Sequence, residues 1–162
     1  MAAEPLWVQV ARRYIGVAEI PGKETAPIIA GWLRKLRSAW SDDATPWCGT
    51  FCATCLQEVG LPIPPHWYRA RAWLDYGVRI PEPVYGCIVV YERKGGGHVG
   101  FAVGRDEHGN LLTLAGNQGD RVSIAPFDPI RVLGYRWPPG AAYSSAPLPR
   151  FAGNLPVSRN EA

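Results

Sequence analysis

The strongest constraint on the fold of this chain is a change of hydrophobic period along its length. In the first half, apolar residues recur at the helical spacing, as Trp7, Val10, Ala11 and Tyr14 do. In the second half, short runs rich in β-branched residues take over, beginning with CIVVY at residues 87–91. Helices followed by strands joined through short turns predict an α+β fold, with N-terminal helices packed on a C-terminal antiparallel β-meander.

The helical half contains three expected helices and a short aromatic one. The first ends at Gly16 and the second begins at Pro27. Thr45 and Pro46 suit the N-cap and first position of the third, which ends at Gly60. The aromatic helix is expected over residues 67–77. The expected strands cover residues 87–91, 99–103, 111–115, 121–125 and 132–137, with a hairpin turn at 106–110.

Length and composition indicate one folded domain. The chain has 162 residues, enough for a core without disulfide or metal support. We expect the domain to span residues 1–138, and residues 139–162, rich in Pro, Ser and Ala, to form a mobile tail. The net charge of +3 is too small to indicate nucleic-acid binding. No apolar run approaches the roughly 20 residues of a membrane span, and no secretory leader is evident.

Three of the four cysteines lie in PWCGTFCATCLQ, with the spacing C-x3-C-x2-C. Cys48 falls in the first turn of the third expected helix, where unpaired amides and the helix dipole favour a thiolate. Cys52 and Cys55 lie further into the helix and are expected in the core, as is Cys87 in a strand. We expect all four to be reduced thiols, which is typical of a protein made in the cytosol.

A metal site is the alternative for these cysteines. Their spacing is that of iron–sulfur ligands in radical enzymes, but such ligands extend from a loop, and here they lie in a helix. A zinc site would need a second ligand pair of the usual spacing, which the sequence lacks. We therefore expect no metal and no cofactor.

A nucleophilic thiol needs a base, and the chain has three histidines. His98 follows three glycines and opens a strand, so it is the expected base. His108 lies in a hairpin turn and is expected to be solvated. Asn117 ends the next strand and could orient the imidazole of His98, with Gln118 and Asp120 as alternatives.

Together, PWCGTF, GCIVVYERKGGGHVGFAVG and LLTLAGNQGDRVSI resemble the NlpC/P60 and CHAP peptidoglycan amidohydrolases, in particular a small branch found in phage lysins. The resemblance extends over residues 7–137. It implies a papain-like fold, with Cys48 as nucleophile, His98 as general base and Asn117 as orienting residue. Such proteins often carry an Asp where this chain has Cys87. The residues expected to contact substrate are Trp47, His66, Trp67 and Gln118.

The resemblance implies a cysteine hydrolase that cleaves an amide bond in peptidoglycan, as an N-acetylmuramoyl-L-alanine amidase or an endopeptidase. The expected substrate is the stem peptide, and the expected settings include bacteriolytic endolysins and antimicrobial effectors. Made in the cytoplasm as a monomer, the protein would need a holin, a virion or a secretion machine to reach the cell wall. The alternative is a non-catalytic domain of the same fold, serving in cell-wall binding or in virion structure.

Overall fold

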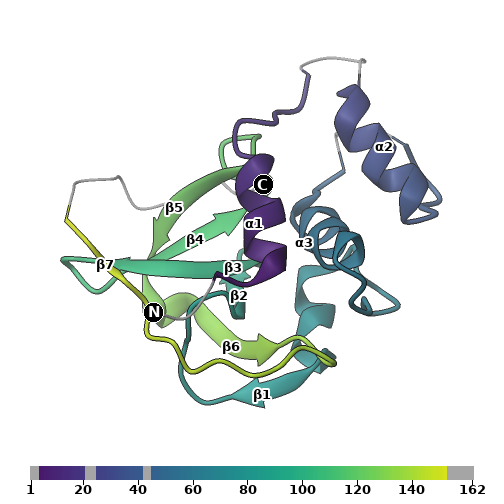
Figure 1. The fold of residues 1–162 in the computed structure, drawn as a ribbon. Helices are drawn as coiled ribbons and strands as arrows, with labels where there is room; N and C mark the ends of the chain where they lie inside the picture. The colour runs from purple at the N-terminus through teal and green to yellow at the C-terminus, as the bar shows by residue number, and fades with distance from the viewer. Residues whose placement is uncertain (1–3, 21–24, 42–44, 153–162) are drawn as a thin grey trace.

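The computed structural model describes residues 4–20, 25–41 and 45–152. Within these residues all helical elements except one short 3-10 helix precede the strands, as the sequence predicts (Figure 1). The helical elements are α1 (Leu6–Arg13), α2 (Pro27–Lys35), α3 (Cys48–Glu58) and the 3-10 helices η1 (Ala70–Asp75) and η2 (Pro129–Arg131). The strands are β1 (Val78–Ile80), β2 (Ile88–Arg93), β3 (Gly96–Asp106), β4 (Leu111–Ala115), β5 (Ser123–Phe127), β6 (Val132–Trp137) and β7 (Arg150–Phe151).

The strands form one sheet in the order β1-β6-β2-β3-β4-β5. Strands β2 to β5 are a meander in which each pairs antiparallel with the next. β6 then returns to the other side of β2, and β1 pairs with its outer edge. β7 is a short parallel addition to the end of β3. The predicted α+β class and antiparallel meander are thus confirmed.

Helix α3 is the central helix of the fold, because it packs on β3 and contacts both α1 and α2. In Figure 1, α1 crosses in front of the sheet, whereas α2 lies beyond α3 on the side away from it. The interface between α3 and the sheet is filled by Phe51, Cys52, Leu56 and Phe101, all fully buried. The position of the first turn of α3 against the sheet therefore depends on the best-packed part of the core.

Two helical predictions need correction. Helix α3 begins at Cys48, and its N-cap is Trp47, whose φ of −124° and ψ of 20° are not helical, so Thr45 is not the cap. Trp47 is held outside the helix because its indole nitrogen donates to Glu19 at 3.1 Å and its side chain is buried. The predicted aromatic helix is reduced to η1, because the Trp67 carbonyl accepts a hydrogen bond from the indole nitrogen of Trp73 at 3.0 Å.

The strand predictions differ from the structure at the edges of the sheet. β5 starts two residues later than expected, because Val122 exchanges backbone hydrogen bonds with Gly16 and Val17. β1 and β7, three and two residues long, are too short for a period to be recognised in the sequence. In the predicted tail, the carbonyls of Ala146 and Pro149 accept hydrogen bonds from the backbone amides of Tyr85 and Arg105. Residues 153–162 lie outside the described residues.

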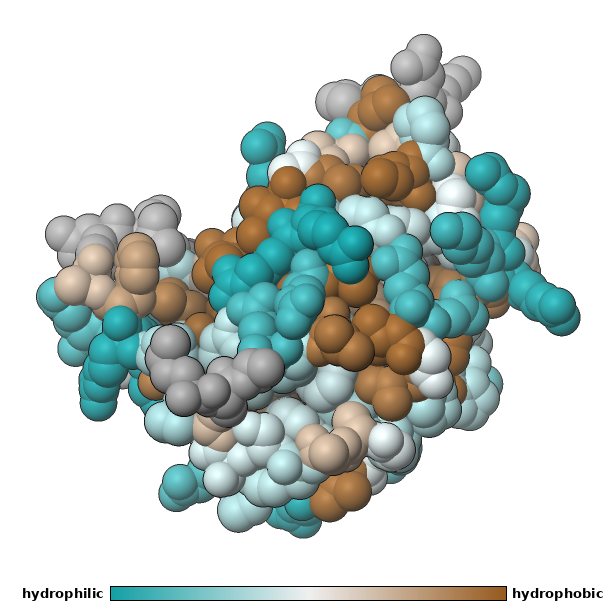
Figure 2. All heavy atoms as spheres, in the orientation of Figure 1, coloured by the Kyte–Doolittle hydropathy of each residue, from teal (hydrophilic) through white to brown (hydrophobic). Residues whose placement is uncertain are grey.

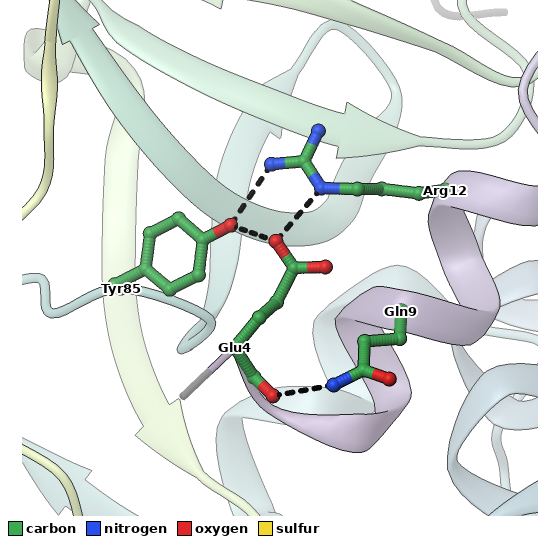
Figure 3. A network of polar contacts seen from close by, with 4 residues as sticks. All are labelled: Glu4, Gln9, Arg12 and Tyr85. Atoms are coloured by element: carbon green, nitrogen blue, oxygen red, sulfur yellow. Dashed lines mark hydrogen bonds and ion pairs between the residues drawn. The ribbon is translucent and has the colours of Figure 1, made fainter. Parts of the chain in front are cut away.

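A polar network ties the start of α1 to the segment before β2 (Figure 3). The Glu4 carboxylate accepts hydrogen bonds from Arg12 Nε, at 2.9 Å, and from the hydroxyl of Tyr85. Arg12 also donates to Tyr85 at 2.9 Å, and Gln9 donates to the carbonyl of Glu4 at 2.9 Å. The network stabilises the position of α1 on the sheet, as interlocked partly buried hydrogen bonds do.

The outer surface is mixed in character. On the face that Figure 2 shows, hydrophobic side chains form several separate groups divided by hydrophilic ones. None of the helices in the described ranges has the length and apolar character required to cross a membrane.

The four cysteines are all buried as free thiols, and this predicts a loss of stability at alkaline pH. Burial raises the pKa of Cys87 from 9.0 to about 12. Below pH 9 the thiol is protonated in both the folded and the unfolded chain. Above it only the unfolded chain loses the proton, so the free energy of unfolding should fall by about 1.4 kcal/mol per pH unit from this thiol, up to its folded pKa.

Urea denaturation at pH 8, 9 and 10 under reducing conditions measures this effect. The free energy of unfolding of Cys87→Ala should decrease less with pH than that of the parent, and the difference should correspond to the release of one proton. Equal decreases in the two proteins would mean that Cys87 ionises as readily in the folded chain as in the unfolded one.

Candidate active site

The structure places Cys48 at the first residue of α3, facing β3. The first helical hydrogen bond runs from the amide of Phe51 to the carbonyl of Trp47, so the amides of Cys48, Gly49 and Thr50 precede the helical ladder. The Cys48 side chain is 5% exposed and lines a surface pocket of about 320 Å³. The thiol is thus close to buried, with its remaining exposure in a pocket.

Two opposing influences act on this thiol. Burial raises its pKa above the ordinary value. The backbone amides of Val99 and Gly49 and the positive charge of Arg93 lower the pKa, but burial outweighs them. The helix terminus alone would favour the thiolate, as expected from the sequence. In the structure, Cys48 is a neutral thiol near pH 7, and its proton has to be removed before it can act as a nucleophile.

The close packing around Cys48 requires glycine at the next position. A Cβ at Gly49 would lie 2.1 Å from the carbonyl oxygen of Trp67, so no side chain fits without moving that backbone. The same carbonyl accepts the Trp73 indole, and this fixes it in place. The segment at Trp67 therefore rests directly on the first turn of α3, and the next residue, Tyr68, forms part of the pocket wall.

His98 lies in β3, next to Val99, whose backbone amide lowers the pKa of the Cys48 thiol. It is fully buried, and the Phe127 ring stacks on its imidazole with centroids 5.2 Å apart and an interplanar angle of 11°. The preceding residue, Gly97, lines the pocket together with Cys48. The imidazole is consequently held rigidly, one residue along β3 from the wall of the Cys48 pocket.

Gln118 is the residue that the structure brings to His98. Its Oε1 lies 3.0 Å from His98 Nε2. The amide nitrogen of Gln118 donates to the carbonyls of Thr113 and Ser123, at 3.2 and 2.9 Å, and to the Ser123 hydroxyl. Because two of these partners are carbonyls, which only accept, the amide orientation is determined and Oε1 must face the ring. In the neutral imidazole, Nε2 then carries the proton and Nδ1 is the basic nitrogen.

Asn117 does not make the hydrogen bond predicted from sequence. Extending the register of β3 and β4 from Phe101 opposite Leu114 would place Asn117 opposite His98, but β4 ends at Ala115. Asn117 has a φ of 63°, which turns the chain out of the strand and directs Gln118 back toward the sheet. The Asn117 amide is buried without a hydrogen-bond partner in the described part of the chain, and Asp120 is exposed in the turn.

The expected substrate-contacting aromatic residues occupy different places. Trp47 is 1% exposed and packs against Gly116, so it supports the core instead of presenting a surface. Trp67 is also buried and contacts Trp40, which lines the Cys48 pocket. His66 is exposed in a neighbouring pocket formed with the prolines at 62, 64 and 65, and its Nδ1 lies 3.1 Å from the Tyr68 hydroxyl. His108 is exposed, as predicted.

The Cys48 pocket has a cationic wall that was not predicted from the sequence. Three arginines line it: Arg69, Arg71 and Arg93. Within the described part of the chain, no acidic residue lines this pocket. The sequence RAR at residues 69–71 indicates a positively charged segment, but it lies within a stretch whose aromatic residues were interpreted only as a helix. Within the described residues, no three His, Cys, Asp or Glu side chains are grouped as a metal site would require.

The tautomer of His98 can be measured directly. We expect long-range ¹H–¹⁵N NMR correlations to show the Nε2–H form for neutral His98, because Gln118 Oε1 accepts only a donor. In Gln118→Leu the ring should populate both tautomers. His66 and His108, which are exposed, serve as internal references. A predominant Nδ1–H form in the parent would contradict the assigned orientation of Gln118.

The requirement for glycine at position 49 predicts a contrast between two helical glycines. Gly49→Ala should lower the free energy of unfolding by about 1–3 kcal/mol, as overpacking does. Gly31→Ala in α2, where the nearest atom to a new Cβ is 3.7 Å away, should raise stability by about 0.5–1 kcal/mol. Thermal denaturation of both variants tests this, and equal effects would exclude the close contact with Trp67.

Comparison with known domains finds one family model that matches part of the chain. The CHAP domain family model matches residues 40–117, a segment that contains α3 and both Cys48 and His98. No curated protein matches the chain. CHAP domains are generally peptidoglycan amidases or peptidases, so the match indicates a peptidoglycan hydrolase that acts on the cell wall. The resemblance seen in the sequence is confirmed, since residues 40–117 match the CHAP domain family model.

Proposed function

We propose that this protein is a cysteine hydrolase that cleaves an amide bond of peptidoglycan, with Cys48 as nucleophile, His98 as general base and Gln118 as the residue that orients the base. The observation that carries the proposal is the buried hydrogen bond between His98 Nε2 and Gln118 Oε1, at 3.0 Å. It leaves Nδ1 as the basic nitrogen of His98, whose neighbour in β3, Gly97, lines the pocket together with Cys48. Gln118 takes the role that the sequence analysis assigned to Asn117.

The reaction begins with removal of the thiol proton. Since burial raises the pKa of Cys48, the proton passes to His98 Nδ1 as the sulfur attacks the amide carbonyl. The backbone amide of Cys48 precedes the helical ladder and is available to stabilise the oxyanion that develops. His98 then gives the proton to the departing amine, which leaves a thioester on Cys48.

Water completes the cycle. His98 accepts a proton from water as the oxygen attacks the thioester and returns it to the departing sulfur, which releases the carboxylic acid and the free thiol. Gln118 carries no charge, so it orients the ring without the electrostatic support that an Asp would give to the imidazolium. The stacked Phe127 ring keeps the imidazole in its plane throughout.

Two cysteines one helical turn apart allow a matched test. Cys48→Ala should reduce release of soluble fragments from purified peptidoglycan by at least about a thousandfold, as loss of a catalytic nucleophile does. Cys52→Ala, which removes a fully buried thiol of the same helix, should retain the activity. Mass spectrometry of the fragments would distinguish an amidase, which separates stem peptide from sugar, from an endopeptidase, which cuts within the peptide.

Equal release by the parent and by Cys48→Ala would remove Cys48 from the mechanism. If neither protein released fragments but both sedimented with the cell wall, the domain would be a non-catalytic wall-binding module. Delivery by a holin, a virion or a secretion machine remains part of the proposal, and fractionation of producing cells tests it.

A further inference from the structure

The pocket beside Cys48 has a strong local charge, although the whole chain does not. Its wall contains three arginines from two different parts of the fold. Arg69 lies just before η1, Arg71 lies within η1, and Arg93 ends β2. The formal charge of the whole chain is only +3, so the positive charge at this site is concentrated. Concentrated charge of one sign in a concave surface favours a ligand of the opposite sign.

Two of the arginines are positioned by contacts that leave donors for a ligand, and the third has a buried donor. Arg71 donates through Nε to the carbonyl of Gly96 at 2.9 Å, which holds the stem of its guanidinium against the pocket. Arg69 lies over the Tyr68 ring, with Cζ 5.7 Å from the centroid. Arg93 Nε is buried without a hydrogen-bond partner in the described residues. A buried donor of this kind is costly unless an acceptor meets it.

The backbone around the pocket is shaped to admit these side chains. A Cβ at Gly97 would lie 3.0 Å from Arg71 Cγ, so glycine makes room for the arginine there. The Glu4 carboxylate forms an ion pair with Arg12, which lies outside this pocket, and no carboxylate of the described residues lines the pocket. None of the three guanidinium groups therefore has a carboxylate partner in the described part of the chain.

The reach of this charge includes the thiol. Arg93 is among the groups that lower the pKa of Cys48, which means that its charge is felt at the sulfur. An anionic group held by Arg93 would accordingly lie close to the amide under attack. Arginine binds carboxylates through paired N–H donors, a geometry that distinguishes a carboxylate from the neutral carboxamide.

We propose that the arginine pocket formed by Arg69, Arg71 and Arg93 binds a free carboxylate of the peptide next to the scissile amide, so that the enzyme selects stem peptides with unamidated carboxyl groups. This inference rests on the proposed function, since it names the substrate class of the same site. The carboxylate is either the α-carboxylate of the γ-linked D-glutamyl residue or the C-terminal carboxylate of the stem.

Binding to Cys48→Ala tests the inference without turnover. The probes are a synthetic N-acetylmuramoyl tripeptide of L-alanine, γ-D-glutamate and L-lysine, its D-glutamyl α-carboxamide, and its C-terminal amide. Calorimetric titration should show binding of the free acid about tenfold tighter than binding of one of the two amides, and that amide identifies the carboxylate. The preference should weaken as salt concentration rises.

Substitution of the arginines tests whether they are responsible for the preference for the free acid. Arg71→Gln and Arg93→Gln, each in the Cys48→Ala background, should bind acid and amide forms with equal affinity. Arg79→Gln, a substitution of an exposed arginine on β1 outside the pocket, should keep the preference. Circular dichroism of each variant confirms that it is folded.

The outcomes separate this inference from the proposed function. Equal binding of acid and amides, or no binding of any of the three, would overturn the arginine pocket as a carboxylate site. Hydrolysis of the tripeptide by the parent is a separate arm. If the preference for the acid were observed and hydrolysis were not, the carboxylate pocket would stand and the proposed function would fail.

Discussion

The structure depends on the packing of the first turn of α3 between β3 and the segment at Trp67. The Trp67 carbonyl approaches Gly49 so closely that a side chain has no room, and the Trp73 indole holds that carbonyl from the other side. β3 meets the same turn through the Val99 amide, which acts on the Cys48 thiol. Two parts of the chain outside α3 thus determine the environment of one sulfur atom. The core residues of α3 hold this arrangement by burial.

This environment sets the chemistry available to the thiol. A cysteine at a helix terminus is often described as a ready thiolate, but here burial is the larger influence and raises its pKa. A thiol of this kind gains reactivity only together with a base that is already oriented. The hydrogen bond of Gln118 to His98 supplies that orientation, and three acceptors around the Gln118 amide nitrogen keep it in place. The two halves of the fold therefore have to assemble before either side chain is useful.

Much of the fold could be predicted from sequence because its signals are local. β4 and β6 occupy the residues that their apolar runs predict, and α1 and α2 follow their helical period. The identity of the residue beside His98 could not be obtained this way. Register alone points to Asn117, and only the left-handed backbone at that residue exchanges it for Gln118. The arginine pocket was missed for a similar reason, since Arg71 and Arg93 meet only through the contact of η1 with the sheet.

The arginine pocket and the buried thiol bear on each other. Arg93 lowers the pKa of Cys48, and a carboxylate bound in the pocket would neutralise part of that effect. Substrate of the proposed class would then make the thiol less acidic at the moment of reaction. A resting thiolate would not be stabilised by such a pocket once a carboxylate had bound to Arg93. A thiol whose proton passes to His98 during the attack is compatible with it, because the base, and not the arginine charge, then determines when the sulfur becomes nucleophilic.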